Sequence, residues 1–405
     1  MKTAHLHVSD LHGLARLATE ATLGVTDLVE AVHAGIARPW RRRDAPDAER
    51  TRGIAARVYA GIRGLTRGIG GGAATALERL APPPAEAIEP TPARLTALAA
   101  LNAVLGDRLA AAGNPLALPM QLVREDGRPL PLPLQAQALA TASPQAGRRL
   151  LILVHGLGLH DGHWRHAGHD YGALLARTQG YTPLYLRYNT GLHVAANGRA
   201  LAELLEALEQ SPEPIESLAI VAHSMGGLVA RSACHHAERA GYAWRSRLRV
   251  LVCLGTPHHG APLERAGLGA QRLLGTLPFA APFARLARLR SAGITDLRHG
   301  SLLEGDAGDA DRFVDAADTR TPLPLPQDVR CYAIAASVGT RRDGLAARLL
   351  GDGLVPLDSA LGRHPQRARR LAFPRARQWV AEGVGHFDLL GDAAVAQRLQ
   401  RWLAI

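Results

Sequence analysis

The stretch Ser217–Gly227 decides the fold, and its sequence is SLAIVAHSMGG. It begins with a short apolar run of the kind found in buried β-strands. The helical segment LVARSACHHAERA follows the two glycines directly. A strand that turns sharply into a helix at a serine predicts a strained turn, in which the serine hydroxyl stands clear of the end of the sheet.

Apolar runs of the same kind alternate with helical segments from residue 148 onward. They are LLILV (150–154), TPLYLRY (182–188), SLAIVAH (217–223), LRVLVCLG (248–255), VRCYAIAAS (329–337) and ARQWVAEG (376–383). Strands that alternate with helices predict an α/β protein with a doubly wound, mostly parallel sheet. In such sheets, ligands bind beyond the carboxyl ends of the strands, where Ser224 is expected to lie.

Ser224 is the candidate nucleophile at that edge. The residues two positions before and after it, Ala222 and Gly226, are small enough for the strand and the helix to approach closely. Glycine is usual at the first of these positions, so Ala222 is a departure of one methyl group. The alternative is that Ser224 only caps the helix, a common role of serine. The strand before it, the glycines after it and suitable partners downstream favour the catalytic role.

A serine hydroxyl needs a neighbouring base and a third group that orients this base. In sheets of this kind, an aspartate or glutamate and then a histidine follow the serine along the chain. Asp352 stands between two glycines after the run 329–337, and His386 follows the last predicted strand. Asp343, in its own Asp-Gly-Leu triplet, is the rival acid. His364 lies in a basic loop and is not expected to take part.

Two backbone N–H groups are expected to bind the negative charge that develops on the substrate oxygen. One is the N–H of Met225, directly after the serine. The other is the N–H of Leu157, in the glycine-rich turn HGLG after the run 150–154. His155 of this turn is interpreted as a structural hydrogen-bonding residue.

We expect no cofactor and no metal. Asp388 and Asp392 lie near His386, but they do not make up the set of oxygen ligands that calcium needs. The polar residues of the segment 160–170 invite comparison with a zinc site, yet they straddle a loop and the start of a helix. These side chains are interpreted as ordinary polar residues near the mouth of a pocket.

Five motifs occur in one order along the chain: VHGLG, AHSMGGLVAR, LGTPHHGAP, GDGLVP and VGHFDLL. In this order they resemble the lipase and GPI inositol-deacylase-like branch of the α/β-hydrolases. The resemblance covers residues 148–405 and implies an α/β-hydrolase fold. It implies Ser224, Asp352 and His386 as the catalytic triad and Leu157 and Met225 at the oxyanion hole. It says much less about the substrate.

The insertion between the apolar runs 248–255 and 329–337, residues 261–326, is longer than the sheet requires. Long insertions in compact domains are typical of lids, and we expect a helical cap here. Its apolar residues would line an acyl-chain pocket or form the core of the cap, and both are open: Leu273, Leu274, Leu277, Phe279, Phe283, Leu286 and Leu289. The run 363–377 holds six arginines and no acidic residue, which would suit phospholipid headgroups or a solvated surface.

The expected reaction is hydrolysis of a carboxylic ester, with a small-molecule or lipid substrate that has a lipophilic acyl group. Two alternatives are open. The same triad would serve a thioesterase or an amidase. A catalytically silent protein could instead recruit a membrane or a partner through its N-terminal helices.

The N-terminal part divides at the Pro-rich stretch 81–92 into residues 1–80 and 93–147. Residues 1–80 predict two amphipathic helices. The first carries Val25, Leu28, Val29, Val32 and Ile36; the second carries Ile54, Val58, Ile62, Leu65 and Ile69, with Arg52, Arg63 and Arg67 opposite. These helices lie on an anionic membrane or pack as a hairpin on the catalytic domain or a second subunit. Residues 93–118 are expected to be helical, and 119–140 to form a short hairpin around Glu125–Arg128.

The bulk properties fit a soluble enzyme of 405 residues with 47% hydrophobic residues. Its net charge of +11 is not read as a sign of nucleic-acid binding, because Lys2 is the only lysine and no recognition motif is present. The odd number of cysteines, Cys234, Cys253 and Cys331, indicates core residues in a reducing compartment. No secretory signal or membrane-spanning run is found. We therefore expect a cytoplasmic location, with contact to the inner face of the membrane through the N-terminal helices; the oligomeric state is open.

Overall fold

The computed structural model describes residues 8–37, 50–80, 91–132, 148–211, 215–261, 290–307, 318–339 and 351–404. The chain forms two compact units. Within the described residues, the first unit contains 8–37, 50–80, 91, 108–117 and 290, and the second contains those from 92 to 107, 118 to 261 and 291 to 404. Three predictions fall outside the described residues: the Pro-rich stretch up to residue 90, the rival acid Asp343 and the seven apolar residues of the expected cap.

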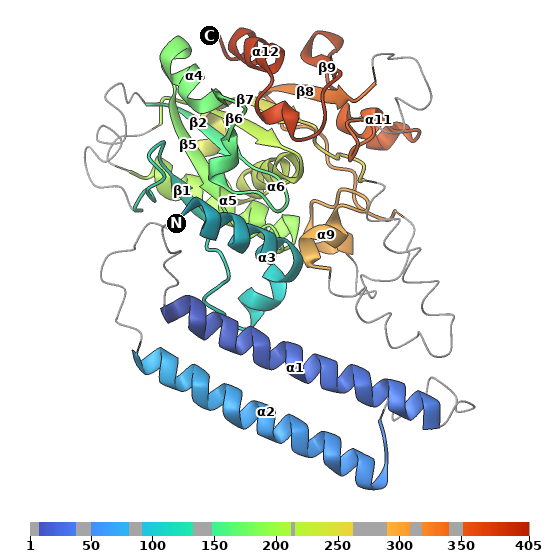
Figure 1. Cartoon of the computed structure of the whole chain (residues 1–405). Helices are drawn as coiled ribbons and strands as arrows, with labels where there is room; N and C mark the ends of the chain where they lie inside the picture. Colours follow the sequence, from blue (N-terminus) through green and yellow to red (C-terminus); the bar gives the residue numbers. More distant parts are fainter. Residues whose placement is uncertain are drawn as a thin grey trace. The chain divides into compact units, whose positions relative to one another are not determined.

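A seven-stranded sheet forms the centre of the second unit (Figure 1). The strands run in the order β1-β5-β2-β6-β7-β8-β9 across it. Their bounds are β1 (Gln121–Val123), β2 (Arg149–Val154), β5 (Thr182–Arg187), β6 (Ser217–His223), β7 (Leu248–Leu254), β8 (Arg330–Ser337) and β9 (Gln378–Glu382). Every neighbouring pair is parallel except β1 and β5. The predicted fold class and the six predicted strands are confirmed.

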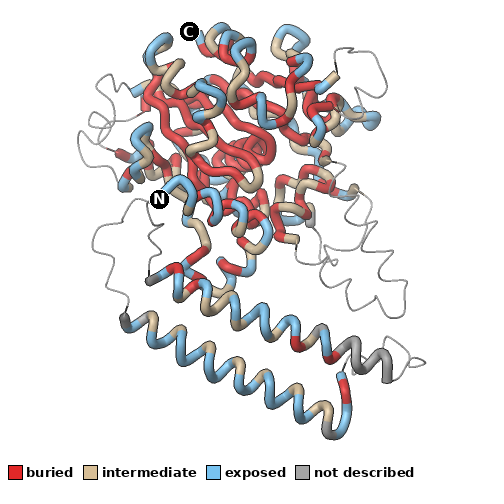
Figure 2. The backbone as a smooth tube through the Cα atoms, viewed as in Figure 1, coloured by how far each residue is buried: buried red, intermediate tan, exposed pale blue. Residues whose placement is uncertain are grey.

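Helices cover both faces of this sheet (Figure 1). α5 (Val194–Glu209) and α6 (Met225–Ala240) pack on one face, and α4 (Tyr171–Gln179) and α12 (Ala393–Leu403) pack on the other. Successive strand residues point to opposite faces, so Ile152 joins the first core and Leu153 joins the second. Because both faces are buried, as Figure 2 shows, the strands are continuous apolar runs in the sequence rather than alternating ones.

Several short elements connect these layers. They are η2 (Asp161–Trp164), β3 (Arg165–His166), β4 (His169–Asp170), α7 (Trp244–Arg247), α9 (Ala292–Asp296), η4 (Glu304–Ala307), α11 (Leu357–Ala360), η5 (Arg367–Arg369), η6 (Arg375–Arg377) and η7 (Asp388–Leu390). β3 and β4 pair only with each other, as a two-stranded antiparallel sheet.

The segment before the first predicted strand contributes an edge to the sheet. α3 (Pro92–Ala111) ends seven residues before the predicted limit of 118. The turn lies where it is predicted, because Arg124 N–H donates to the carbonyl of Arg128 at 2.9 Å. However, β1 pairs antiparallel with β5, and Leu122 is fully buried opposite Leu186. The predicted hairpin is present as β1 and its antiparallel bridge from Val123 to Pro129, but a strand of three residues does not reveal that it joins the sheet.

The first unit is built on two long helices, α1 (Val8–Ala37) and α2 (Gly53–Leu80). Both predicted N-terminal helices are therefore present. They run antiparallel, since Thr19 of α1 lies beside Gly70 and Glu30 pairs with Arg63 of α2. The side chains of Leu28, Val32, Ile36 and Ile54 lie outside the described residues. In the described part of the chain, no helix is both long enough and apolar enough to cross a membrane.

Candidate active site

Ser224 occupies the strained turn that its sequence predicts. It lies between β6 and α6 with φ 56° and ψ −127°, a backbone conformation that non-glycine residues rarely adopt. Its N–H donates to the carbonyl of Leu254 at 2.8 Å, which fixes the turn on the neighbouring strand. Ser224 stands at the N-cap position of α6, but its side chain makes no capping hydrogen bond. The helix-cap alternative therefore does not explain this serine.

Small residues around Ser224 let three segments converge. A Cβ atom on Gly226 would lie 2.5 Å from the carbonyl oxygen of Val154 and 2.6 Å from that of His155, so α6 can approach β2 only with glycine there. A Cβ on Gly156 would lie 2.8 Å from the Cβ of Ser224. Ala222 is fully buried in the apolar core, where its methyl group is accommodated. The departure from glycine at this position leaves the turn intact.

Asp352 and His386 meet at the same edge of the sheet. His386 Nδ1 lies 2.6 Å from Asp352 Oδ2, and both residues are buried. The other carboxylate oxygen of Asp352 accepts hydrogen bonds from the N–H groups of Leu354 (3.0 Å) and Val355 (2.8 Å). The carboxylate is thus held in place by its own loop, and it orients the imidazole by its second oxygen.

His386 follows β9 and Ser224 follows β6. Contacts of two further residues, His223 and Gly255, hold the ends of these strands together. The Nε2 of His223, directly before Ser224, lies 3.0 Å from the carbonyl oxygen of His386. A Cβ on Gly255, after β7, would lie 3.2 Å from both Asp352 Oδ2 and His386 Cε1. Among the described residues, Ser224 Oγ has no hydrogen-bond partner. Hydrogen bonds between a nucleophile and its base often form fully only with substrate.

His223 is a residue that the sequence analysis missed. Burial lowers its pKa well below the usual value of a histidine, so the ring is neutral and its Nε2 can donate to the backbone of His386. Its ring also lies beside that of His386, with centroids 4.7 Å apart. The only signal in the sequence is the position of His223 directly before the serine. His223 is interpreted there as the last residue of the strand 217–223.

The two predicted oxyanion donors, Met225 and Leu157, are each next in the chain to a residue at the strained turn or in close approach to it. Met225 is the first residue of α6 and is fully buried, and Leu157 lies in the turn whose Gly156 contacts the serine. His155 in this turn has a structural role, as interpreted from the sequence. Burial lowers its pKa to about 4, and its ring stacks on that of Tyr188 at 4.5 Å between centroids.

The side chains considered as metal ligands have structural partners. Asp161 pairs with Arg187 at 2.6 Å, and His160 accepts a hydrogen bond from Gly162 N–H at the start of η2. Asp388 accepts from Gly385 N–H (3.0 Å), and Asp392 caps α12. Within the described ranges, no group of three or more His, Cys, Asp or Glu side chains is placed to hold a metal ion.

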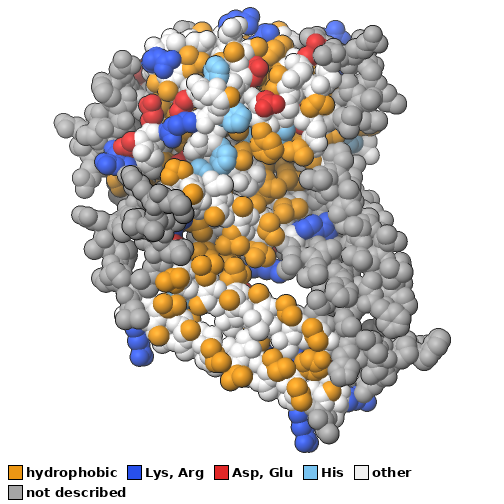
Figure 3. All heavy atoms as spheres, viewed as in Figure 1, with side chains coloured by type: hydrophobic (Ala, Val, Ile, Leu, Met, Phe, Trp, Pro, Cys, Tyr) orange, Lys and Arg blue, Asp and Glu red, His pale blue; other side chains and the backbone are white. Residues whose placement is uncertain are grey.

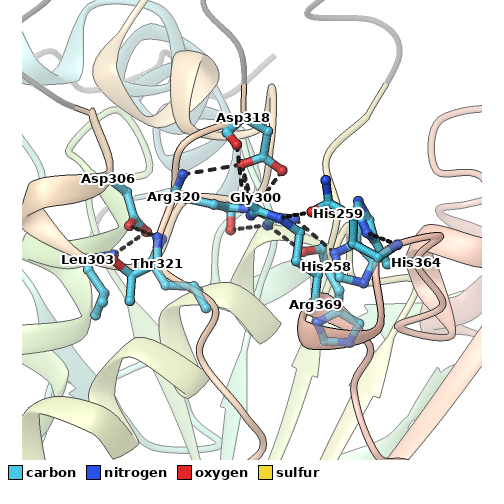
Figure 4. A network of polar contacts seen from close by, with 12 residues as sticks. His258, His259, Gly300, Leu303, Asp306, Asp318, Arg320, Thr321, His364 and Arg369 are labelled. Atoms are coloured by element: carbon cyan, nitrogen blue, oxygen red, sulfur yellow. Dashed lines mark hydrogen bonds and ion pairs between the residues drawn. The ribbon is translucent and has the colours of Figure 1, made fainter.

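A buried polar network fixes the loop after β7, which begins with Gly255 (Figure 4). Arg320 donates to the carbonyls of His258 (2.8 Å) and Gly300 (3.0 Å). Its carboxylate partner Asp318 also binds Arg369 at 3.0 Å. The network therefore holds the loop against the segment that contains Gly300 and against the segment of Asp318 and Arg320. Arg369 belongs to the basic run 363–377, so at least this arginine is engaged within the protein rather than turned to a headgroup.

One cavity in the described part of the chain does not contain any of the three predicted catalytic residues. It has a volume of about 700 Å³ and lies between the end of α6, α7 and the segment 323–328. Arg231, Tyr242 and Leu325 are among its lining residues. We therefore do not assign it to the acyl group.

Residues 168–319 match the family model of the PGAP1-like alpha/beta domain. This segment is therefore similar to the PGAP1-like α/β domain. The match includes Ser224, with the strand and helix around it, and it supports the family resemblance of the sequence motifs. The strand order shows the predicted α/β fold with a mostly parallel sheet, and the family match supports its assignment to the α/β-hydrolases. Asp352 and His386 lie beyond the matched residues of the PGAP1-like domain.

Solved structures with a similar chain course are lipases and esterases with low sequence identity. Lipase BlEst2 of Bacillus licheniformis, in its mature form, is 18% identical with a TM-score of 0.42, and the match covers 64% of this chain and 92% of that one. EstA of Clostridium botulinum is 13% identical with a TM-score of 0.36 over 64% and 86% of the two chains. Aspergillus fumigatus lipase B is 12% identical with a TM-score of 0.37 over 65% and 56%. Among curated protein sequences, none is similar to this chain.

Proposed function

We propose that the protein is a serine hydrolase that cleaves carboxylic esters with a lipophilic acyl group. The observation that carries this proposal is the strained backbone of Ser224 at a strand-to-helix turn. The hydroxyl of Ser224 makes no hydrogen bond that caps the helix. The hydrogen bond between His386 and Asp352 at the same sheet edge supports it. Strain of this kind persists only where the surrounding structure holds it, and it is typical of functional sites.

The proposed reaction proceeds through an acyl-enzyme. Ser224 Oγ attacks the ester carbonyl carbon while His386 Nε2 takes the hydroxyl proton. The N–H groups of Met225 and Leu157 bind the oxyanion of the tetrahedral intermediate. His386 then gives its proton to the leaving alcohol. In the second half, His386 removes a proton from water, the hydroxide attacks the acyl carbon, and Ser224 leaves with the returned proton.

A fluorophosphonate probe tests the nucleophile, since it labels activated serines. The wild-type protein should be labelled, and Ser224→Ala should not. Ser246→Ala is the matched control, because it removes an exposed hydroxyl that donates only to Ala243 within its own turn; it should be labelled like the wild type. An unlabelled wild-type protein would contradict the hydrolase function.

A series of p-nitrophenyl esters of increasing chain length tests the substrate class. We expect kcat/KM to rise with acyl length, because each buried methylene contributes about 0.8 kcal/mol. A preference for the shortest esters would remove the lipid-like substrate and leave the esterase. The matching thioesters and anilides distinguish a thioesterase or an amidase that uses the same residues.

We also propose that the protein works in the cytoplasm, where thiols remain reduced. The three cysteines support this, because each is free and buried. Burial raises the pKa of Cys253 to about 11, which keeps it an unreactive thiol. Fractionation of cells that make the tagged full chain tests the location, and recovery outside the cytoplasm and its membrane fraction would contradict it.

A further inference from the structure

The α1–α2 hairpin has charged side chains inside and apolar side chains outside. Glu30 is 2% exposed and accepts hydrogen bonds from Arg63 and from Arg50, the latter at 2.8 Å. Thr51 donates its N–H and its hydroxyl to the other carboxylate oxygen of Glu30. Asp27 binds Arg63 Nε at 2.9 Å. The contact between the two helices is therefore stabilised largely by charge and hydrogen bonds.

Eight large apolar side chains among the described residues of the hairpin are instead exposed, between 41% and 67% of their area. We call this set the apolar face: Leu11, Leu14, Val25 and Val29 of α1 with Val58, Ile62, Leu65 and Ile69 of α2. Single exposed apolar residues are ordinary, but a continuous set at helical spacing is not. Figure 3 shows hydrophobic side chains at intervals along both helices on the side in view.

Both halves of the apolar face lie on one side of the hairpin. At 3.6 residues per turn, the apolar stripe of each helix is displaced from the contact with its partner by roughly a third of a turn. When each helix is viewed from its N-terminus, the apolar stripe is rotated away from the contact in the same direction on both helices. Because the helices run antiparallel, the same sense places the two stripes on the same side. The hairpin therefore presents one broad apolar surface rather than two separate ones.

The charges around the apolar face favour an anionic surface as its partner. Arg79 of α2 is exposed, and the helical spacing places it at the outer border of the face. Glu20, an exposed carboxylate of α1, projects from the opposite side. Asp27 and Glu30 are engaged between the helices. Arginine at the border of an apolar helix face can extend to lipid phosphates while its methylenes cover apolar surface.

We propose that the apolar face binds the surface of an anionic lipid bilayer, with α1 and α2 lying parallel to that surface. Long helices with an apolar face and basic residues beside it bind bilayers in this way. A second copy fits less well, because two identical apolar faces would bring the bordering arginine of one copy toward that of the other. The inference concerns a binding surface and does not rest on the proposed catalytic function.

Flotation of the full chain with lipid vesicles tests this inference. The wild type should bind phosphatidylglycerol-containing vesicles and bind pure phosphatidylcholine vesicles several-fold more weakly. Val58→Asp and Leu65→Asp place a carboxylate in the apolar face, and each should lower the partition coefficient at least about tenfold. Ala60→Asp is the matched control, since Ala60 is exposed on the opposite side of the same helix. It should bind nearly as the wild type does.

Three results would overturn the inference: variants of the apolar face that bind vesicles like the wild type, equal binding to both kinds of vesicle, or an equal loss in Ala60→Asp. A dimer in light scattering that Val58→Asp disrupts, without vesicle binding by the wild type, would assign the face to a second copy instead. Hydrolysis of a short soluble ester should be unchanged in these variants. Repeating the flotation with Ser224→Ala separates membrane binding from catalysis, because binding should persist without the nucleophile.

Discussion

At the level of single residues, the candidate site depends on backbone approach more than on side-chain chemistry. Gly226, Gly156 and Gly255 each stand where a Cβ atom would meet Val154, Ser224 or His386 at close range. These contacts bring the ends of β2, β6 and β7 together below the nucleophile. The side chains of Asp352 and His386 then need to reach only a short distance. The glycines could be found in the sequence, but what each one contacts depends on the fold.

Asp352→Asn tests the role of the carboxylate in orienting His386. An amide still fits the site, but it can present an N–H to Nδ1 and favour the wrong tautomer of the imidazole. We expect kcat to fall by about 10²–10⁴-fold with little change in KM. Stopped-flow or steady-state hydrolysis of a p-nitrophenyl ester measures this loss.

Asp388→Asn is the control for that experiment. Asp388 lies two residues from His386 and accepts a hydrogen bond from Gly385 N–H, which an amide oxygen can also accept. Its substitution should leave kcat within about threefold of the wild type. If Asp388→Asn lost as much activity as Asp352→Asn, a general disturbance of the loop would explain both results better than a specific role of Asp352.

At the level of elements, the sequence predicted best where burial alone determines the pattern. The parallel strands β2, β5, β6, β7 and β8 are almost wholly buried, so each one is an apolar run that can be read directly, whereas β9 at the edge is buried only at Ala381. β1 lies in the hairpin predicted for residues 119–140, but its pairing with β5 depends on tertiary structure and could not be predicted. The network around Arg320 escaped prediction for the same reason, since Asp318, His258 and Gly300 come from separate loops.

The hairpin shows how a correct helix prediction can leave the contact face undecided. From the sequence, the stripe from Val58 to Ile69 is expected to meet either a membrane or a packing partner, because most surface helices bury their apolar face. The structure instead places Arg63 at the contact, where Asp27 and Glu30 neutralise it. A period in one helix says which residues share a face. It does not say which face the neighbouring helix covers when that neighbour offers carboxylates.

Glu30 makes the stability of the hairpin depend on pH. Burial alone would raise its pKa, but hydrogen bonds from Arg50, Thr51 and Arg63 lower the pKa from 4.5 to about 2. The folded state therefore binds this proton more weakly than the unfolded state does. The ionised group stabilises the hairpin above about pH 4.5, and this contribution is lost as the pH falls toward about 2.

Glu30→Gln removes this contribution at every pH. At neutral pH, we expect it to lower the free energy of opening of α1 and α2 by about 1–3 kcal/mol, with half-exposed Arg50 limiting the effect. The difference from the wild type should shrink as the pH falls from about 4.5, because Glu30 itself is then protonated. Hydrogen exchange of helix peptides, corrected for intrinsic rates, measures this. Glu20→Gln, on the exposed side of α1, should match the wild type throughout; a difference as large as that of Glu30→Gln would refute the assignment.

At the level of the whole molecule, the two units differ in what stabilises them. The second unit buries two large apolar cores, one on each face of its sheet. In α1 and α2, the buried side chains among the described residues are polar, with Asp10, Thr26 and Glu30 as examples. Apolar burial is the main stabilising contribution to folding, at about 25 cal/mol per Å². Among the described residues of α1 and α2, no large apolar side chain is fully buried and eight remain exposed, so the hairpin gains less from this contribution.

We therefore expect the chain to open in two steps, with α1 and α2 exchanging their amide hydrogens at a lower free energy than β2, β6 and β7. Hydrogen exchange by mass spectrometry on the full protein measures both regions in one sample, and moderate urea should expose the helices first. Phosphatidylglycerol vesicles should slow exchange in α1 and α2 only, because a ligand that binds the folded hairpin stabilises it by mass action. Val58→Asp should abolish that protection and leave the strands unchanged. Equal exchange in helices and strands at every urea concentration would instead mean that the hairpin opens only when the whole chain unfolds.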